Sequence, residues 1–136
     1  MKYSEMAKVA EVETAQRQPL MKGEYTAEVI GAEYGVSRVA QNPYYRIMFQ
    51  VTAGEYKGRT AVKYMTLTAK SATRFFRQMD VLGIDTVFFA EIEDDPDAEA
   101  IVCRELIGAH AKIVCGDPEW YEGKSQTNIK SLKRAA

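Results

Sequence analysis

The segment from residue 43 to 68 constrains the fold most, because it has the pattern of two strands joined by a tight turn. From Tyr45 to Val51 apolar residues alternate with mostly polar ones, and this period of two gives a strand one buried and one solvent-facing side. Gly54 and Gly58 bracket a turn, where glycine takes a positive φ without strain. Residues 59–68 then return as a second strand rich in Thr, Val and Tyr. The segment predicts a β-hairpin.

Four further segments have strand character. Residues 23–34 alternate in the same way, and Gly31 inside the pattern indicates a bulge. Residues 36–42 form a polar connection to the hairpin. Residues 86–92 are a short apolar run that we interpret as β-like. Residues 109–115 predict the fourth strand of the sheet, Asp117 and Pro118 a turn, and residues 120–131 a last hairpin whose returning strand covers 126–131.

Two segments predict helices. Residues 70–82 place apolar side chains on one helical stripe that includes Phe75, Phe76 and Met79, with Gly83 as the stop. Thr68 or Ser71 is expected as the N-cap. A second short helix is expected over residues 97–107, ending before a glycine.

The order of these elements predicts the fold. Five short antiparallel strands with a helix between the third and the fourth make a mostly β fold with the connectivity of the OB-fold, a small Greek-key barrel. A β-sandwich is less natural because the helix interrupts the strands. The 136 residues suit one domain. We expect it over residues 23–131, preceded by an arm at 1–22, either frayed or a docked helix, and followed by a basic tail at 132–136.

Charge is segregated along a chain whose net charge is only −1. Residues 57–78 hold six basic side chains and no acidic one, whereas residues 91–99 hold six carboxylates and no base. No apolar run reaches the roughly 20 residues of a membrane span, and the first residues lack the apolar core of a signal peptide. We therefore expect a cytoplasmic protein that does not enter a membrane.

The sequence does not support an enzyme, a metal site or a cofactor. Cys103 and Cys115 lie too far apart for the tight ligand pairs of zinc sites, and His110 adds no fourth ligand. Gly123–Ser125 matches the end of a phosphate-binding loop motif. That motif also requires a glycine five residues earlier, and this position is Pro118. Because His110 is the only histidine and has no suitably spaced Ser or Asp, a nucleophile with a base is equally unsupported. We expect no catalytic residues.

The remaining candidates for a functional site are aromatic and basic residues that alternate along the strands. Single-stranded nucleic acid is held by rings on which bases stack, set in a positively charged groove. Tyr44 and Arg46 have the strongest case, because both lie in the polar phase of a strand. The full set of candidates is Tyr44, Arg46, Tyr56, Lys57, Arg59, Lys63, Tyr64, Trp120, Tyr121, Lys124 and Lys130.

Several of these candidates have alternatives. Strand register decides between Lys63 and Tyr64. For Tyr56 and Tyr121 the equal alternative is packing over their own turns, and for Trp120 it is burial at one end of the barrel.

Six short motifs resemble phage-encoded and prophage-encoded OB-fold proteins of the single-stranded-DNA-binding type, over residues 23–131. They are Gly23-Glu-Tyr-x-Ala, Phe49-x-Val-Thr-x-Gly-Glu-Tyr-Lys-Gly-Arg, Leu67-Thr-x-Lys, Leu82-Gly-Ile, Glu105-Leu-Ile-Gly and Tyr121-x-Gly-Lys-x-Gln. Unlike bacterial relatives with an acidic C-terminal tail, this chain ends in Lys-Ser-Leu-Lys-Arg-Ala-Ala. The resemblance implies single-stranded DNA as the partner, and phage replication or recombination proteins as further partners.

Two functional hypotheses follow from these observations. The first is a non-enzymatic, largely sequence-independent single-stranded-DNA-binding protein, either monomeric or a homo-oligomer. The second is an OB-fold module that binds another protein and has no nucleic-acid face, which the net charge favours. Duplex or RNA binding stays open.

Overall fold

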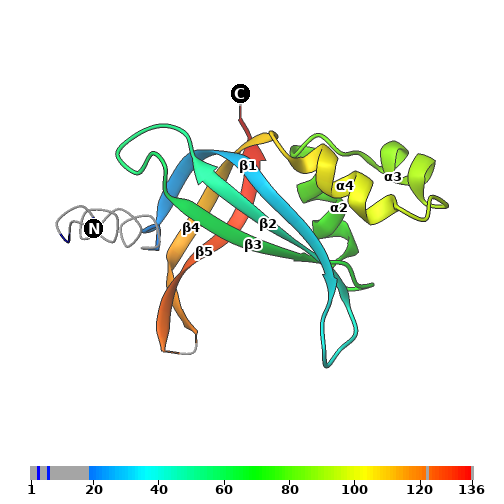
Figure 1. The fold of residues 1–136 in the computed structure, drawn as a ribbon, viewed down its shortest axis with the longest axis horizontal. Coiled ribbons are helices and arrows are strands. Elements are labelled where there is room, and N and C mark those ends of the chain that lie inside the picture. Colours follow the sequence, from blue (N-terminus) through cyan, green and yellow to red (C-terminus); the bar gives the residue numbers. More distant parts are fainter. Residues whose placement is uncertain (1–2, 4–5, 7–18, 122, 136) are drawn as a thin grey trace.

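The structure, a computed structural model, describes residues 3, 6, 19–121 and 123–135. In chain order its elements are β1 (Gly23–Val36), β2 (Pro43–Val51), β3 (Thr60–Thr66), α2 (Ala72–Val81), α3 (Thr86–Ile92), α4 (Ala98–Leu106), β4 (His110–Tyr121) and β5 (Lys124–Arg134). Figure 1 shows a strongly twisted sheet with the three helices gathered at one end. No helix in the described part of the chain is long and apolar enough to cross a membrane.

The five strands form one antiparallel sheet in the order β3-β2-β1-β4-β5. The two outer strands approach each other, and the Lys63 ammonium on β3 donates a hydrogen bond of 3.1 Å to the carbonyl oxygen of Ile129 on β5. This strand order, with a helix between β3 and β4, is that of the OB-fold. The predicted fold is confirmed.

The core is built from the apolar phase that the sequence predicted. Ile47, Phe49 and Val51 of β2 are buried, as are Ala27 and Val29 of β1. A bulge at the predicted Gly31 lets β1 bend, because the register to β2 shifts between Val29 and Gly31. The bend keeps the later part of β1 in contact with β2.

Helix α2 closes one end of the barrel with the predicted apolar stripe. Phe75, Met79 and Leu82 are buried, and Phe76 is half-buried against the same core. Ser71 is the N-cap residue but makes no side-chain cap bond. Its backbone N–H instead donates to the Thr68 hydroxyl oxygen at 3.2 Å.

Two local predictions are wrong. Residues 86–92 form helix α3 rather than a β-like run, because the Asp85 carboxylate accepts a hydrogen bond of 2.9 Å from the Phe88 N–H and caps the helix. A short apolar run does not distinguish the two structures. The chain also does not turn at Pro118. Strand β4 continues to Tyr121, and an irregularity between Gly116 and Glu119 accommodates the proline.

The boundaries of the barrel extend beyond residues 23–131. Strand β5 runs to Arg134, and Leu132 is buried, so these residues belong to the sheet rather than to a tail. Leu20 is also buried in the core, and its N–H donates to the Thr127 hydroxyl oxygen at 2.8 Å. Of the expected arm, residues 1–2, 4–5 and 7–18 lie outside the described part of the chain.

Candidate nucleic-acid interface

The outward face of β2 and β3 brings two tyrosines together. Tyr44 pairs with Thr66 and Arg46 pairs with Tyr64, so these side chains share the face opposite the core. The ring centroids of Tyr44 and Tyr64 lie 5.5 Å apart, with an angle of 58° between the rings. Tyr64 is 58% exposed. The register therefore selects Tyr64 for the outward face and leaves an accessible aromatic surface there.

Gly35 on the neighbouring strand supports the Tyr44 ring. A Cβ atom at Gly35 would lie 2.6 Å from the Tyr44 hydroxyl oxygen and 2.7 Å from its ring carbon Cζ. Tyr44 thus lies flat across the β1 backbone on one side and against Tyr64 on the other. This arrangement restricts the ring before any ligand binds.

Arg46 lies between an aromatic and an acidic neighbour. Tyr64 is its partner on β3, and Glu33 is its partner on β1. The exposed Glu33 carboxylate lowers the positive potential around Arg46. Sequence reasoning missed this neighbour because the bulge in β1 sets which residue faces Arg46.

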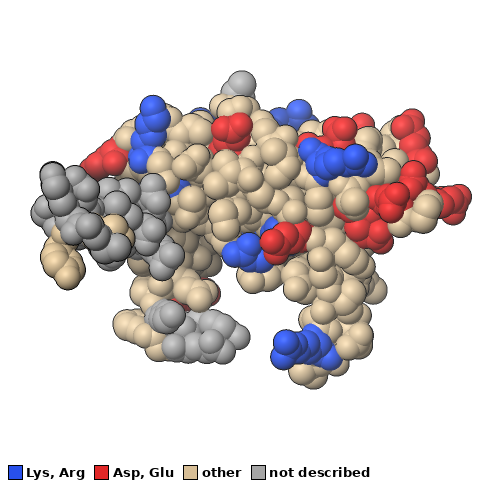
Figure 2. Space-filling view, in the orientation of Figure 1, with Lys and Arg blue, Asp and Glu red and all other residues tan. Residues whose placement is uncertain are grey.

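A polar cleft of about 300 Å³ opens beside Tyr64. Arg46, Thr60 and Tyr64 line one side, and Ser125–Thr127 of β5 line the other. In Figure 2 the β1–β2 and β4–β5 hairpins project from the body of the molecule and leave a hollow between them. The cleft residues of β5 were not predicted as a group, because sequence alone does not place β5 beside β3.

Lys63 faces the other way. It pairs with Ile47, whose side chain is buried, and so lies in the inward phase of β3. Burial lowers the pKa of the Lys63 ammonium, and the nearby Arg74 lowers it further. Its hydrogen bond to Ile129 joins β3 to β5. Lys63 therefore links two strands of the barrel and does not lie on the outward face.

The β2–β3 turn forms a separate cluster. The Arg59 guanidinium carbon lies 4.4 Å from the Tyr56 ring centroid, and the Tyr56 ring packs edge-on against Tyr25 at 5.7 Å. This turn follows the C-terminal end of β2, whereas Tyr44 lies near its start. Tyr56, Arg59 and the exposed Lys57 are thus not brought together with Tyr44 and Tyr64.

The β4–β5 hairpin presents Trp120 to solvent. Its side chain is 77% exposed, and Trp120 pairs with Ser125, a residue of the polar cleft. Cross-strand partners share a face of the hairpin, so Trp120 lies on the same face as Ser125. It is not a core residue. The side chains of Tyr121 and Lys124 lie outside the described residues.

Basic side chains continue from Tyr64 along α2. A small cavity beside Tyr64 is also lined by Arg74, and a second one, between α2 and β5, is lined by Arg74, Arg77 and Lys130. The ion pairs among the described residues are Lys133–Glu24 and Arg134–Asp80, and neither uses these cations. Arg74 and Arg77 belong to the basic segment 57–78, but sequence reasoning did not single them out as binding residues.

The described residues contain no group of His, Cys, Asp and Glu that could hold a metal ion. The outward face of β2 and β3 offers aromatic rings for stacking, polar groups for hydrogen bonding and the positive charge of Arg46.

Comparisons with known proteins do not show a family for this chain. No family model matches the sequence, and no curated protein matches it. Among solved structures, the chain is similar to yeast RPA bound to ssDNA, with 12% identity and a TM-score of 0.39 over 89% of this chain and 84% of that chain.

Proposed function

We propose that this protein binds single-stranded DNA, without catalysis and largely without sequence preference, on the outward face of β2 and β3. The observation that carries the proposal is the contact between the half-buried Tyr44 and the exposed Tyr64 beside Arg46. Rings on which bases stack, next to a cation that contacts phosphate, are the two components of sequence-tolerant single-strand binding.

The polar cleft and the basic side chains give the strand a path. A base stacked on Tyr64 has the hydroxyl and amide groups of Thr60 and Gln126 within the adjoining cleft. Phosphates that leave this point along α2 meet Arg74, Arg77 and then Lys130. Trp120 offers a further ring on the hairpin that borders the cleft. We therefore extend the proposed interface to Trp120 on one side and to α2 on the other.

The biological setting of this proposal is phage DNA replication or recombination in the cytoplasm of a bacterial host. It rests on the resemblance of the chain to phage-encoded OB-fold proteins. The second candidate function is a protein-binding OB-fold module without a nucleic-acid face. The placement of Glu33 opposite Arg46 and the net charge of −1 favour that second candidate.

One titration separates the two candidates. Fluorescence anisotropy with a labelled pyrimidine single strand and a matched duplex, each at low and at physiological salt, measures affinity and its salt dependence. We expect tighter binding of the single strand, weakening linearly in log affinity against log salt concentration. Absence of binding to either ligand at low salt would assign the protein to the second candidate, and preference for the duplex would refute the proposed stacking face.

A further inference from the structure

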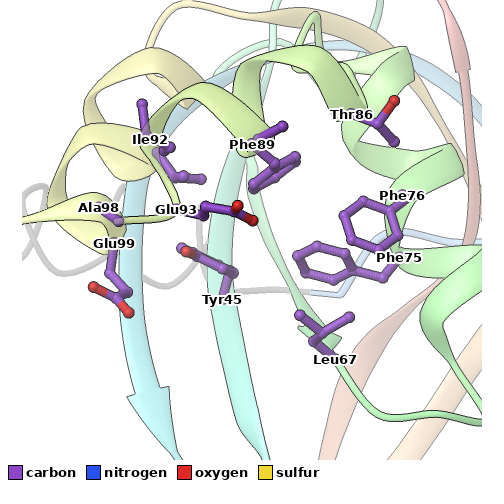
Figure 3. A pocket seen from close by; sticks show the side chains of 12 residues that line it. Tyr45, Leu67, Phe75, Phe76, Thr86, Phe89, Ile92, Glu93, Ala98 and Glu99 are labelled. Atoms are coloured by element: carbon purple, nitrogen blue, oxygen red, sulfur yellow. The ribbon is translucent and has the colours of Figure 1, made fainter. Parts of the chain in front are cut away.

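A mostly apolar cavity of about 440 Å³ lies under the three helices, away from the proposed DNA face. Its walls are formed by side chains of α2, α3, α4 and the start of β2, among them Phe75, Phe76, Phe89 and Tyr45 (Figure 3). The aromatic rings contact one another, with the centroids of Phe76 and Phe89 at 5.5 Å. The volume lies within the range of roughly 300–1,000 Å³ that is usual for ligand pockets.

Tyr45 carries a polar atom into this apolar space. Its side chain is only 6% exposed and lines the cavity. Burial raises the pKa of Tyr45, so its hydroxyl group stays a neutral hydrogen-bonding group. The hydroxyl group therefore offers a ligand in the cavity one polar contact in otherwise mostly apolar surroundings.

Two carboxylates line the cavity, in a segment that is acidic throughout. Glu93 and Glu99 line it directly, and four more acidic residues lie between residues 91 and 97. No Lys or Arg occurs between Arg77 and Arg104. Figure 2 shows the acidic side chains gathered over the helical end of the molecule. A nucleic acid or an anionic membrane would be repelled here, whereas a cationic partner would be attracted.

We propose that this cavity is a docking site for a partner protein, which inserts one apolar or aromatic side chain from a segment that also carries Lys or Arg. The apolar side chain contacts Phe76 and Phe89, while the flanking cation pairs with Glu93 or Glu99. A backbone group of the same segment reaches the Tyr45 hydroxyl. Helix α2 contributes to both sites, but none of the residues that line the cavity belongs to the proposed DNA face.

Selection from displayed random peptides on the immobilised full chain tests the proposal. We expect enriched peptides to share an apolar or aromatic residue next to Lys or Arg. Synthetic copies of these peptides should bind the parent protein and lose about tenfold or more in affinity toward two variants. Ala90→Trp fills the cavity from an exposed position of its lining, and Glu93→Lys reverses a charge at the mouth.

The control is Glu105→Lys, an exposed charge reversal on α4 outside the cavity, which should bind the peptides like the parent. Thermal melts establish that each variant is folded. Peptide affinity of Tyr45→Phe is a second measurement, because this substitution removes only the hydroxyl group that the peptide backbone is proposed to reach. Enrichment of acidic peptides, no enrichment at all, or equal binding by parent and Ala90→Trp would overturn the proposal. Concentration-dependent self-association that Ala90→Trp abolishes would instead assign the cavity to a second copy of this chain, and would equally overturn it.

Discussion

Tyr44 and Tyr64, on adjacent strands, hold their ring centroids 5.5 Å apart on the outer face of the barrel. The two rings are inclined at 58°, so they meet at a steep angle rather than in a parallel stack. Each ring therefore keeps part of its surface free, and Tyr64 contributes most of the exposed area because Tyr44 lies against Gly35. A base can stack on Tyr64 without displacing Tyr44.

Substitution of Tyr64 by Ala tests this arrangement. Loss of one stacking ring should weaken single-strand binding by about 1–3 kcal/mol, or roughly 5- to 150-fold, with an unchanged dependence on salt. Because Tyr64 is largely exposed, the melting temperature should change little. Anisotropy titrations and a thermal melt measure both quantities. Tyr44→Ala should act in the same direction, and full affinity in both variants would place the site elsewhere, with Trp120 as the next residue to change.

Arg46 should contribute charge rather than stacking. Arg46→Ala removes one cation, so the slope of log affinity against log salt concentration should become shallower by about one contact. Arg104→Ala removes an exposed cation on α4 and is the matched control, expected to leave the slope unchanged. Glu33→Gln should strengthen binding at low salt, because it removes the carboxylate opposite Arg46. Equal slopes for Arg46→Ala and the parent would exclude Arg46 from the interface.

Packing of α2 against the barrel predicts the largest effect on stability. Phe75 is 2% exposed and its ring lies 6.0 Å from both Tyr45 and Phe89, centroid to centroid. Phe75→Ala should lower the free energy of unfolding by about 3–5 kcal/mol, because it leaves a cavity in a small core. Val87→Ala, an exposed apolar change on α3, should cost less than about 0.5 kcal/mol. Urea unfolding monitored by fluorescence compares the two, and similar midpoints would contradict the packing of α2.

The alternation of apolar residues was sufficient to predict the strands, the buried phase and the OB-fold, because burial on one face imposes a period of two. The α3 segment was not predictable in this way. Its apolar run is too short for periodicity to separate helix from strand. The N-cap hydrogen bond to the Asp85 carboxylate favours the helix. The prediction of a turn at Pro118 was wrong for a related reason, because a bulge lets a strand continue through proline.

The candidate site was predictable only in part. Tyr44 and Arg46 followed from strand phase, but the choice of Tyr64 over Lys63 required the β2–β3 register. The cleft between β3 and β5, and the continuation along Arg74, arise where the barrel closes, and contacts between distant strands leave no periodic signal in the sequence.

Stability at alkaline pH should depend on Cys115. Burial raises the pKa of this thiol to about 11 from an ordinary value of 9.0. The folded state therefore keeps the proton while the unfolded chain loses it, so the stabilisation is complete below pH 9 and declines as pH rises toward 11. The free energy of unfolding of the parent should fall more over this range than that of Cys115→Ala. Urea titrations at several pH values check this, and parallel pH profiles would contradict it.

Gly35→Ala provides the sharpest test of the Tyr44 position, because it alters the ring without removing it. The added Cβ would lie 2.6 Å from the Tyr44 hydroxyl oxygen, so the ring must move off the β1 backbone. Tyr64 blocks movement in one direction, and the ring is therefore pushed away from the sheet. We expect single-strand affinity to fall toward that of Tyr44→Ala with an unchanged salt slope. Gly31→Ala on the same strand is the matched control, because the Cβ there meets only the Met48 Cβ, at an ordinary contact distance of 3.6 Å, and leaves both tyrosines in place. If Gly35→Ala binds the strand as tightly as Gly31→Ala and the parent, the position of Tyr44 over Gly35 does not contribute to recognition.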